Sequence, residues 1–383
     1  MSKKVLVVFG TRPEAIKMVP LVKELKKTDV IEPVVCITAQ HRQMLDQVLE
    51  IFDVIPDYDL NIMQDRQTIA DITIRALNGI DNVIADVNPE MVMVHGDTTT
   101  TFAGGLAAFY RKVKVGHVEA GLRTFNKYFP FPEEMNRKLT GVIADVHFAP
   151  TAVNRQNLIE EGVNSNTIYV TGNTVIDALQ TTVKKDYVFS APWLNDVDFE
   201  NKRVIVLTAH RRENLGQPLR NICAAVSDIV DKHKDVEAVY PVHMNPAVRE
   251  TVNEILGGKE RIHLIEPVDV QDMHNLMAKA YIVLTDSGGL QEEAPALGKP
   301  VIVLRNETER LEAIEAGTVR MAGTDANEIF NQTALLLENR YEYEKMAKAV
   351  NPYGDGKASK RIADALMYEF GYTDIKPSEF NTR

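Results

Sequence analysis

The first half of the chain alternates short apolar runs with longer stretches in which apolar residues recur every three or four positions. The short runs are rich in β-branched residues and end at polar or turn-forming residues, which is typical of buried strands. Strict alternation of this kind predicts a parallel sheet covered by helices on both faces. The predicted strands are 5–9, 34–38, 91–94, 113–118, 146–148 and 168–170, and the predicted helices are 16–27, 43–52, 68–87, 100–111, 133–143 and 153–160.

The alternation lapses between Lys184 and Lys202, a stretch rich in aromatic and acidic residues that we interpret as a linker. It then restarts, and a chain of 383 residues exceeds one ordinary core. We therefore predict an α/β protein with two Rossmann-like doubly wound domains, 1–184 and 185–357, facing each other across a cleft. The later strands are predicted at 204–207, 238–241, 262–265, 282–285 and 301–304, and a last helical pattern covers 358–370.

Composition narrows the class of protein. Hydrophobic residues make up 45% of the chain, which is enough for sizeable cores, and the net charge of -11 argues against binding to nucleic acid or an anionic membrane. Cys36 and Cys223 lie in apolar contexts, which predicts buried thiols and fits a reducing cytosol. Because no apolar run has the length of a signal-peptide core or a membrane span, we expect a cytoplasmic protein.

A glycine and two cations follow the first predicted strand. Gly10 ends the strand, Arg12 lies at the next turn and Lys17 lies in the helix that follows. Free backbone N–H groups at a helix start, together with these cations, suit a phosphate or pyrophosphate. The alternative is a tight turn with solvated charges. The spacing lacks G-x-G-x-x-G, so a nicotinamide fingerprint is absent.

Histidine and carboxylate residues alternate where two further strands end. His95 precedes Asp97 by two positions, and His117 precedes Glu119 by two, so each pair projects from one side of an extended chain. Imidazole and carboxylate together suit a metal such as zinc, iron or manganese. They equally suit acid and base chemistry. In a third interpretation Asp97 caps the following helix and Glu119 pairs with Arg123.

A loop rich in aromatic residues and proline, 125–132, leads into the helix predicted to begin at Glu133. Glu133 and Glu134 in a first helical turn are favoured by the helix dipole, and Arg137 could pair with Glu133 on the same face. Alternatively, the aromatic side chains close over a sugar and exclude water. The sequence leaves both interpretations open.

The second domain carries its own polar clusters at strand ends. His210 and Arg211 open a run of four ionisable residues after the first strand, which indicates an anion site or solvated loop charges, and His243 follows the next strand. A Ser-Gly-Gly run at 287–289 lies between a strand and a helix, where backbone N–H groups can approach a phosphate. Glu293, one turn into that helix, suits the hydroxyls of a ribose or simply the helix dipole.

These motifs together resemble the non-hydrolysing UDP-N-acetylglucosamine 2-epimerases of bacteria. Between positions 9 and 300 the chain contains, in the family's order, FGTRPEAIKM, VHGDTTT, HVEAGLRT, PFPEEMNR, TAHRREN and DSGGLQEEAPALGKP. The resemblance implies a fold similar to the glycosyltransferase B class, in which a last helix within 358–383 crosses back to the first domain. It also implies a homodimer that reversibly converts UDP-GlcNAc to UDP-ManNAc without a metal or nicotinamide cofactor.

The reaction of this family requires carboxylates as proton-transfer groups. Carbon 2 of the sugar has no adjoining carbonyl, so its proton is removed only as UDP leaves carbon 1, which yields a bound 2-acetamidoglucal. UDP then adds back while carbon 2 is protonated on its other face. This requires at least two protonatable groups, and cations that stabilise the departing pyrophosphate.

The resemblance assigns residues of this chain to three sets. The catalytic set, in which Asp97 and Glu119 are expected to transfer protons and His210 to assist UDP departure, is Asp97, Glu119, Glu133 and His210. The positions that match UDP-binding residues are Arg12, Lys17, Ser287, Gly288, Gly289, Glu293 and Arg310. The positions that match an allosteric UDP-GlcNAc site are Gln40, Gln43, Arg66, Glu133, Arg211 and His243.

Three other functions fit the same sequence. They are a glycosyltransferase of the same fold, a hydrolysing epimerase that releases free ManNAc, and a nucleotide-sugar sensor without turnover. The intact set of three carboxylates argues against the sensor. Because ManNAc donors commonly feed bacterial envelope polymers, the expected role is supply of cell-envelope polysaccharide synthesis.

Overall fold

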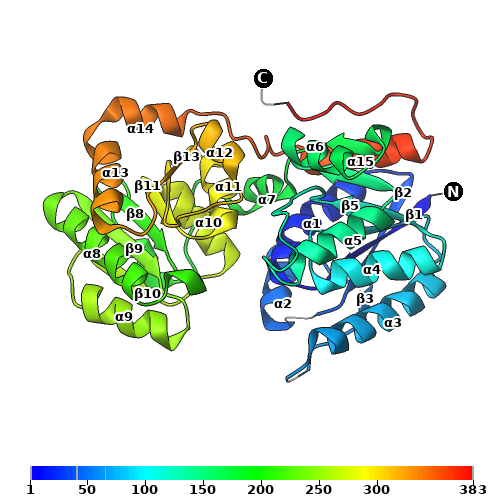
Figure 1. Ribbon diagram of the computed structural model, residues 1–383, viewed down its shortest axis with the longest axis horizontal. Coiled ribbons are helices and arrows are strands. Elements are labelled where there is room, and N and C mark those ends of the chain that lie inside the picture. The colour runs from blue at the N-terminus through cyan, green and yellow to red at the C-terminus, as the bar shows by residue number, and fades with distance from the viewer. Residues whose placement is uncertain (1, 40–41, 65, 382–383) are drawn as a thin grey trace. The chain divides into compact units, whose positions relative to one another are not determined.

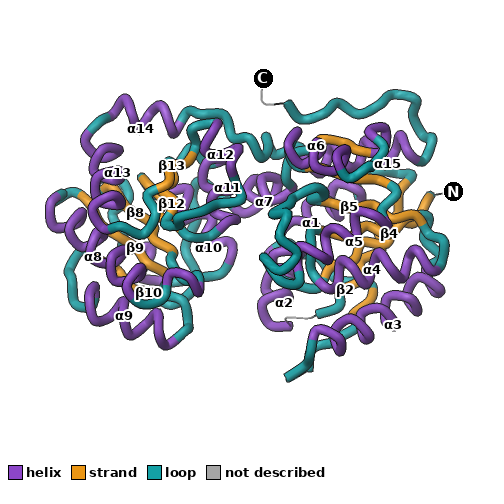
Figure 2. The backbone as a smooth tube through the Cα atoms, viewed as in Figure 1, coloured by secondary structure: helices purple, strands orange, loops and turns teal. Residues whose placement is uncertain are grey.

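A computed structural model describes residues 2–39, 42–64 and 66–381, and the chain divides into two compact units (Figure 1). The first unit comprises Met1–Thr181 with Tyr353–Asn381, and the second comprises Thr182–Pro352. Each unit contains one parallel sheet surrounded by helices (Figure 2), which confirms the predicted Rossmann-like α/β class. The segment interpreted as a linker belongs to the second unit and contains a 3-10 helix at Pro192–Asp196.

The sheet of the first unit has seven strands in the order β3-β2-β1-β4-β5-β6-β7. Every neighbouring pair is parallel. The strands are β1 (Lys3–Phe9), β2 (Ile31–Ile37), β3 (Tyr58–Asp59), β4 (Met91–His95), β5 (Lys114–Val118), β6 (Val146–Ala149) and β7 (Ile168–Val170). Because β1 and β4 are neighbours, the chain reverses its direction of winding between them, which makes this pair the switch point of the sheet.

Helices of the first unit pack in two groups. One group is α3, α4 and α5 in succession, and the other places α1 against α2 and α15. The helix α15 therefore belongs to the first unit although it lies near the end of the chain. The bounds are α1 (Arg12–Leu25), α2 (Arg42–Ile51), α3 (Ile69–Val87), α4 (Thr99–Tyr110), α5 (Glu133–Ile143), α6 (Ala152–Glu160), α7 (Thr174–Thr182) and α15 (Ala358–Glu369).

The second unit repeats the design with six parallel strands in the order β10-β9-β8-β11-β12-β13. Its switch point lies between β8 and β11. The strands are β8 (Arg203–Thr208), β9 (Val236–Pro241), β10 (Ile262–Ile265), β11 (Ile282–Thr285), β12 (Val301–Val303) and β13 (Val319–Met321). The helices are α8 (Gln217–Lys232), α9 (Pro246–Leu256), α10 (Val270–Lys279), α11 (Gly288–Ala296), α12 (Leu311–Glu315), α13 (Ala326–Glu338) and α14 (Arg340–Ala347).

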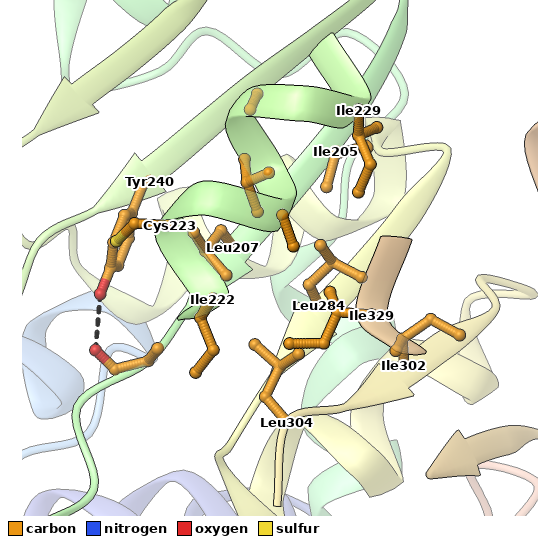
Figure 3. Close-up of a cluster of buried hydrophobic side chains, with 14 of the residues drawn as sticks. Ile205, Leu207, Ile222, Cys223, Ile229, Tyr240, Leu284, Ile302, Leu304 and Ile329 are labelled. Atoms are coloured by element: carbon orange, nitrogen blue, oxygen red, sulfur yellow. Dashed lines mark hydrogen bonds between the residues drawn. The ribbon is translucent and has the colours of Figure 1, made fainter. Parts of the chain in front are cut away.

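Buried apolar side chains form a core between each sheet and its helices. In the second unit Leu207 and Leu284 of the central strands are fully buried beside Ile222 of α8 (Figure 3). Tyr240 belongs to the same cluster, and its hydroxyl donates a 2.6 Å hydrogen bond to the carbonyl of Ala209, the dashed line in Figure 3. The core thereby fixes the backbone immediately before His210. Both cysteines, Cys36 and Cys223, are buried free thiols, as predicted.

Candidate active site

The switch points of both sheets carry the residues singled out from the sequence. In the first unit Gly10 follows β1 and Asp97 lies just after β4. In the second unit His210 lies just after β8, and Ser287 lies between β11 and α11. Open α/β sheets bind their ligands at the carboxyl ends of strands where the order reverses. The fold therefore provides a candidate ligand-binding edge in each unit.

Glu119 is held from several sides by donors of the first unit. The ammonium of Lys17 contacts its Oε1, His95 Nε2 lies 3.1 Å from its Oε2, and Asn173 Nδ2 donates to Oε1 at 2.9 Å. The residue has a φ of 62°, a left-handed backbone that is uncommon outside glycine. Strain of this kind persists where the surroundings over-determine it, often at functional sites. Lys17, assigned to UDP by resemblance, thus also pairs with the presumed acid.

The surroundings of Asp97 shift its pKa in the direction opposite to that of Glu119. Its Oδ2 accepts a 2.6 Å hydrogen bond from Arg137, and its backbone carbonyl accepts from Asn136 Nδ2 at 3.0 Å. Burial raises the pKa of Asp97, and although Arg137 opposes this shift, Glu119 and Glu133 add to it. Burial acts in the same direction on Glu119, but Lys17 and His95 hold the pKa of that carboxyl well below its ordinary value. The carboxyl ends of β4 and β5 therefore carry two carboxyl groups of contrasting proton affinity.

Two structural interpretations of these acids are wrong. Asp97 is not the cap of α4, because the Thr98 side chain performs that task and accepts from the Thr101 N–H. Glu119 does not pair with Arg123, which instead makes bidentate contacts with Glu161. Neither acid therefore has the structural role that the sequence suggested.

Glu134, rather than Glu133, organises the aromatic loop. Its fully buried carboxylate accepts backbone N–H groups of Thr124 at 3.1 Å and Phe125 at 3.0 Å. Arg137 NH1 lies 3.3 Å from the same carboxylate, so the expected pairing of Arg137 with Glu133 is replaced by one with Glu134 and Asp97. Glu133 is the first residue of α5, and its charge acts on Asp97.

The backbone turn after β1 is already occupied. Glu14 is buried, and its Oε2 accepts the N–H groups of Gly10 at 3.0 Å and Thr11 at 2.8 Å. Its Oε1 accepts from the Thr98 hydroxyl at 2.7 Å. A carboxylate of the same helix turn therefore takes these two N–H groups, and the phosphate site expected at this helix start stays a prediction. The side chain of Arg12 remains a candidate phosphate ligand.

The histidines beside the two acids have structural partners. His117 is buried and donates through Nε2 to the carbonyl of Gly96 at 2.7 Å, while His95 lies on Glu119. Among residues 2–39, 42–64 and 66–381, no group of three or more histidine, cysteine, aspartate or glutamate residues is placed to hold a metal ion.

In the second unit Asp286 anchors the turn that carries His210. This buried carboxylate accepts the N–H groups of His210 and Arg211, each at 2.8 Å, and the Asn214 amide at 3.0 Å. Its other oxygen lies 3.6 Å from His210 Nδ1. The rings of His210 and His243 stack with centroids 5.4 Å apart. Burial lowers the pKa of His210, with Asp286 opposing the shift, so the ring is neutral near pH 7.

The start of α11 brings a cation against a glycine. Arg310 contacts Glu292, with Nε 3.0 Å from Oε1, and also contacts Glu309. A Cβ added at Gly288 would lie 2.9 Å from Arg310 Cζ, so a larger residue there would move the guanidinium from its present position. Glu293 contacts the buried His274, whose Nε2 lies 3.2 Å from Glu293 Oε2.

Sequence reasoning identified the site residues at strand ends but missed the residues that hold them. Most of them leave a weak signal, because they lie far from their partners along the sequence, whereas Glu14 follows Thr11 by three positions, the spacing of a capping box. The missed residues are Glu14, Asn173, His274 and Asp286, with Glu134 and Arg137 noted only for other roles.

The residues matched to an allosteric site are spread over both units. Gln40 lies outside the described residues, as does the side chain of Gln43. Arg66 is exposed with a φ of 57°, and Glu133 is half-buried. Arg211 is half-buried beside His210, and His243 stacks on the His210 ring.

We expect Gly288→Ala to weaken binding of UDP-GlcNAc, the ligand that the motif resemblance implies. The new methyl group displaces the Arg310 guanidinium from the helix start, and loss of one such cation raises KM about tenfold. Steady-state kinetics measure this change. Gly105→Ala is a matched control, because its added Cβ meets other atoms only at 3.9 Å. An unchanged KM in Gly288→Ala would remove Arg310 from the binding set.

Buried histidines make stability depend on pH. Burial lowers the pKa of His117 from 6.5 to about 3, and burial also lowers the pKa of His147. Below pH 6.5 the unfolded chain therefore binds more protons than the folded one. The free energy of unfolding consequently decreases as the pH is lowered. Each histidine contributes up to about 1.4 kcal/mol per pH unit. Urea unfolding at pH 7.5, 6.5 and 5.5 checks this, and equal stabilities at all three would contradict it.

A family model described as UDP-N-acetylglucosamine 2-epimerase matches residues 23–367 of the chain. The chain belongs to the UDP-N-acetylglucosamine 2-epimerase family. This confirms the resemblance inferred from the motifs. The Bacillus subtilis protein named UDP-N-acetylglucosamine 2-epimerase is 57% identical over 377 residues, which cover 98% of both chains.

Solved structures of this epimerase family agree with the fold. A crystal structure of UDP-N-acetylglucosamine 2-epimerase is 55% identical, covers 100% of both chains and superposes with a TM-score of 0.92. The Neisseria meningitidis UDP-GlcNAc 2-epimerase bound to UDP-GlcNAc is 49% identical, with a TM-score of 0.87 and coverage of 95% of this chain and 99% of that one. Within the described part of the chain, no helix is long and apolar enough to cross a membrane.

Proposed function

We propose that the chain interconverts UDP-GlcNAc and UDP-ManNAc by inverting carbon 2 without hydrolysis. The observation that carries this proposal is the pair of carboxyl groups, Asp97 and Glu119, whose environments push their pKa values apart. Opposed proton affinities in one site are the usual mark of separate acid and base roles. Family membership and the UDP-GlcNAc bound to the Neisseria relative support the choice of substrate.

In the proposed mechanism the sugar is handled by groups of the first unit. Glu119, ionised because Lys17 and His95 lower its pKa, accepts the carbon 2 proton of one epimer as UDP leaves carbon 1. The bound 2-acetamidoglucal is then protonated on its other face by Asp97, whose raised pKa lets it hold a proton, as UDP returns. In the reverse direction the two groups exchange roles. Glu133 is the third carboxylate of the proposed catalytic set, and its charge raises the pKa of Asp97.

The diphosphate is assigned to cations and a helix start. Departure of UDP leaves negative charge on its terminal phosphate, which preorganised donors stabilise most effectively. His210, neutral near pH 7 and anchored through Asp286, is the proposed assistant of this step. The other proposed UDP ligands are Arg12, Lys17, Ser287, Gly288, Gly289, Glu293 and Arg310.

Product analysis tests this function. Purified protein is incubated with UDP-GlcNAc or with UDP-ManNAc plus a trace of UDP-GlcNAc, and the products are separated. The proposal predicts one fixed ratio of the two nucleotide sugars from either side, with no free ManNAc. Free ManNAc would indicate a hydrolysing epimerase, transfer only to an added acceptor would indicate a glycosyltransferase, and binding without turnover would indicate a sensor.

We also propose a cytoplasmic homodimer that supplies ManNAc donors for envelope polysaccharide and is activated by UDP-GlcNAc at a second position. The contact between the rings of His243 and His210 supports the activation, because a ligand that binds His243 would change the position of the catalytic histidine. The proposed activator ligands are Gln40, Gln43, Arg66, Glu133, Arg211 and His243.

Activation has a kinetic consequence. With UDP-ManNAc alone we expect a lag or sigmoidal rates, and added UDP-GlcNAc should abolish them because it shifts the enzyme to its active state. His243→Ala should weaken this response more than Ile375→Ala, whose side chain is 78% exposed near the end of the chain. Hyperbolic rates without a lag would contradict the proposal.

A further inference from the structure

Asn173 has a fixed orientation beside the catalytic carboxylate. Its Oδ1 accepts the N–H of Val175 at 3.1 Å, which leaves Nδ2 to donate to Glu119 at 2.9 Å. The residue is only 3% exposed. A carboxamide held by its oxygen in this way can present only its N–H₂ group to Glu119. The position of Glu119 therefore depends on the loop 171–173, which connects β7 to α7.

The loop 171–173 is held by chain that lies almost two hundred residues later in the sequence. The N–H of Asn173 donates to the carbonyl of Tyr353 at 2.6 Å. Gly172 has a φ of 83°, and a Cβ added there would lie 3.2 Å from the Cα of Gly354. The carbonyl of Thr171 accepts from Arg361 NH1 at 3.2 Å. The loop thus depends on the return of the chain into the first unit.

The C-terminal segment, residues 373–381, completes this support. The N–H of Phe380 donates to the carbonyl of Val170 at 2.7 Å, at the end of β7. The Phe380 ring lies 5.5 Å from Arg361 Cζ, and its Cγ lies 3.7 Å from the Cβ position of Gly172. Glu379 pairs with Arg155 of α6 at 2.9 Å. In Figure 1 this segment is the red chain that runs past α15 and α6.

We propose that the C-terminal segment positions Glu119 for proton transfer. Phe380 and Arg361 hold the loop 171–173 in place, and Asn173 of this loop fixes the carboxylate through its hydrogen bond. The inference rests on the proposed function in one respect, that Glu119 transfers a proton. Phe380 and Arg361 are positioning residues, since neither touches Glu119. Misplacement of a reacting group by a fraction of an ångström lowers kcat while substrate binding is retained.

A double-mutant comparison tests the chain of contacts. Phe380→Ala should lower kcat about fivefold and Asn173→Ala about tenfold, with KM changed less than about twofold in both. The double variant should match Asn173→Ala alone, because Phe380 acts through Asn173. Phe380→Leu, which keeps apolar volume, should recover part of the loss. Ile375→Ala, in the same segment and 78% exposed, is the control that should equal wild type.

Hydrogen exchange of the peptide 168–176 gives a readout that does not need activity. Phe380→Ala should increase exchange of this peptide at least about threefold relative to Ile375→Ala while the melting temperature stays within a few degrees. Unchanged exchange and unchanged kcat would overturn the proposal, as would a double variant whose losses multiply. Wild-type protein that fails to epimerise would instead contradict the proposed function. Hydrogen exchange of the peptide would still show whether Phe380 stabilises the loop 171–173.

Discussion

Asp97→Asn is expected to lower the rate of carbon 2 proton exchange about a thousandfold. General acid and base groups contribute roughly 10²- to 10⁴-fold, and Asp97 is the carboxyl whose pKa is raised by burial. The amide retains an oxygen that can accept from Arg137, so the 2.6 Å contact and the fold survive the change. The loss should therefore appear in kcat and leave KM for UDP-GlcNAc within a few-fold of wild type.

The exchange of solvent deuterium into carbon 2 measures this effect, with Asp81→Asn as the control. Asp81 lies in α3 and is paired with Arg111 on the surface of the first unit. Its amide variant should exchange at the wild-type rate. Exchange at the wild-type rate in Asp97→Asn would exclude Asp97 from the proton-transfer groups and leave Glu119 with Glu133 as candidates.

Arg137→Met is expected to lower the free energy of unfolding by about 3 kcal/mol. The guanidinium is 6% exposed and lies between Asp97 and the fully buried Glu134. Removal of one partner of a buried ion pair leaves the other charge uncompensated, which is among the costliest single changes. Urea unfolding at pH 7.5 measures the loss. Lys138→Met, the neighbouring and more exposed cation of α5, should lose less than about 1 kcal/mol.

The same variant should change how activity depends on pH. Arg137 is the strongest influence that lowers the pKa of Asp97, so its removal raises that pKa further. In the direction of reaction in which Asp97 accepts the proton it must be ionised, and activity in that direction will therefore fall at a higher pH on the acid side. Arg137→Lys, which keeps the charge, should shift the profile less. An acid side unmoved in Arg137→Met would show that Asp97 is not the group whose ionisation limits the rate.

Local pattern was sufficient for most of the fold. The predicted bounds of α5, β7, β10 and β11 match the structure. The three strands are short runs of mainly apolar residues, and α5 begins at the two glutamates that favour a first helical turn. The strands β3 and β13 were not predicted, since Tyr58–Asp59 and Val319–Met321 include polar residues and do not form an apolar run. Helix α1 begins at Arg12 rather than Ile16, because Pro13 suits a first turn and the Glu14 carboxylate satisfies the turn before it.

The site was predictable where chemistry lies at strand ends and unpredictable where contacts join distant segments. Asp97, Glu119 and His210 each follow a buried strand, so the parallel sheets place them at binding edges. The support of Glu119 by Asn173, and of His210 by Asp286, depends on pairings of strands and loops that no local pattern encodes. The occupation of the first turn by Glu14 likewise required side-chain geometry.

The most direct test of the proposed chemistry is an NMR experiment in heavy water with wild-type protein and UDP-GlcNAc. If carbon 2 is inverted through a bound glycal, every UDP-ManNAc formed carries deuterium at carbon 2, and the recovered UDP-GlcNAc gains deuterium as the mixture approaches its fixed ratio. UDP-ManNAc that appears with its original carbon 2 proton would contradict proton removal by Asp97 and Glu119.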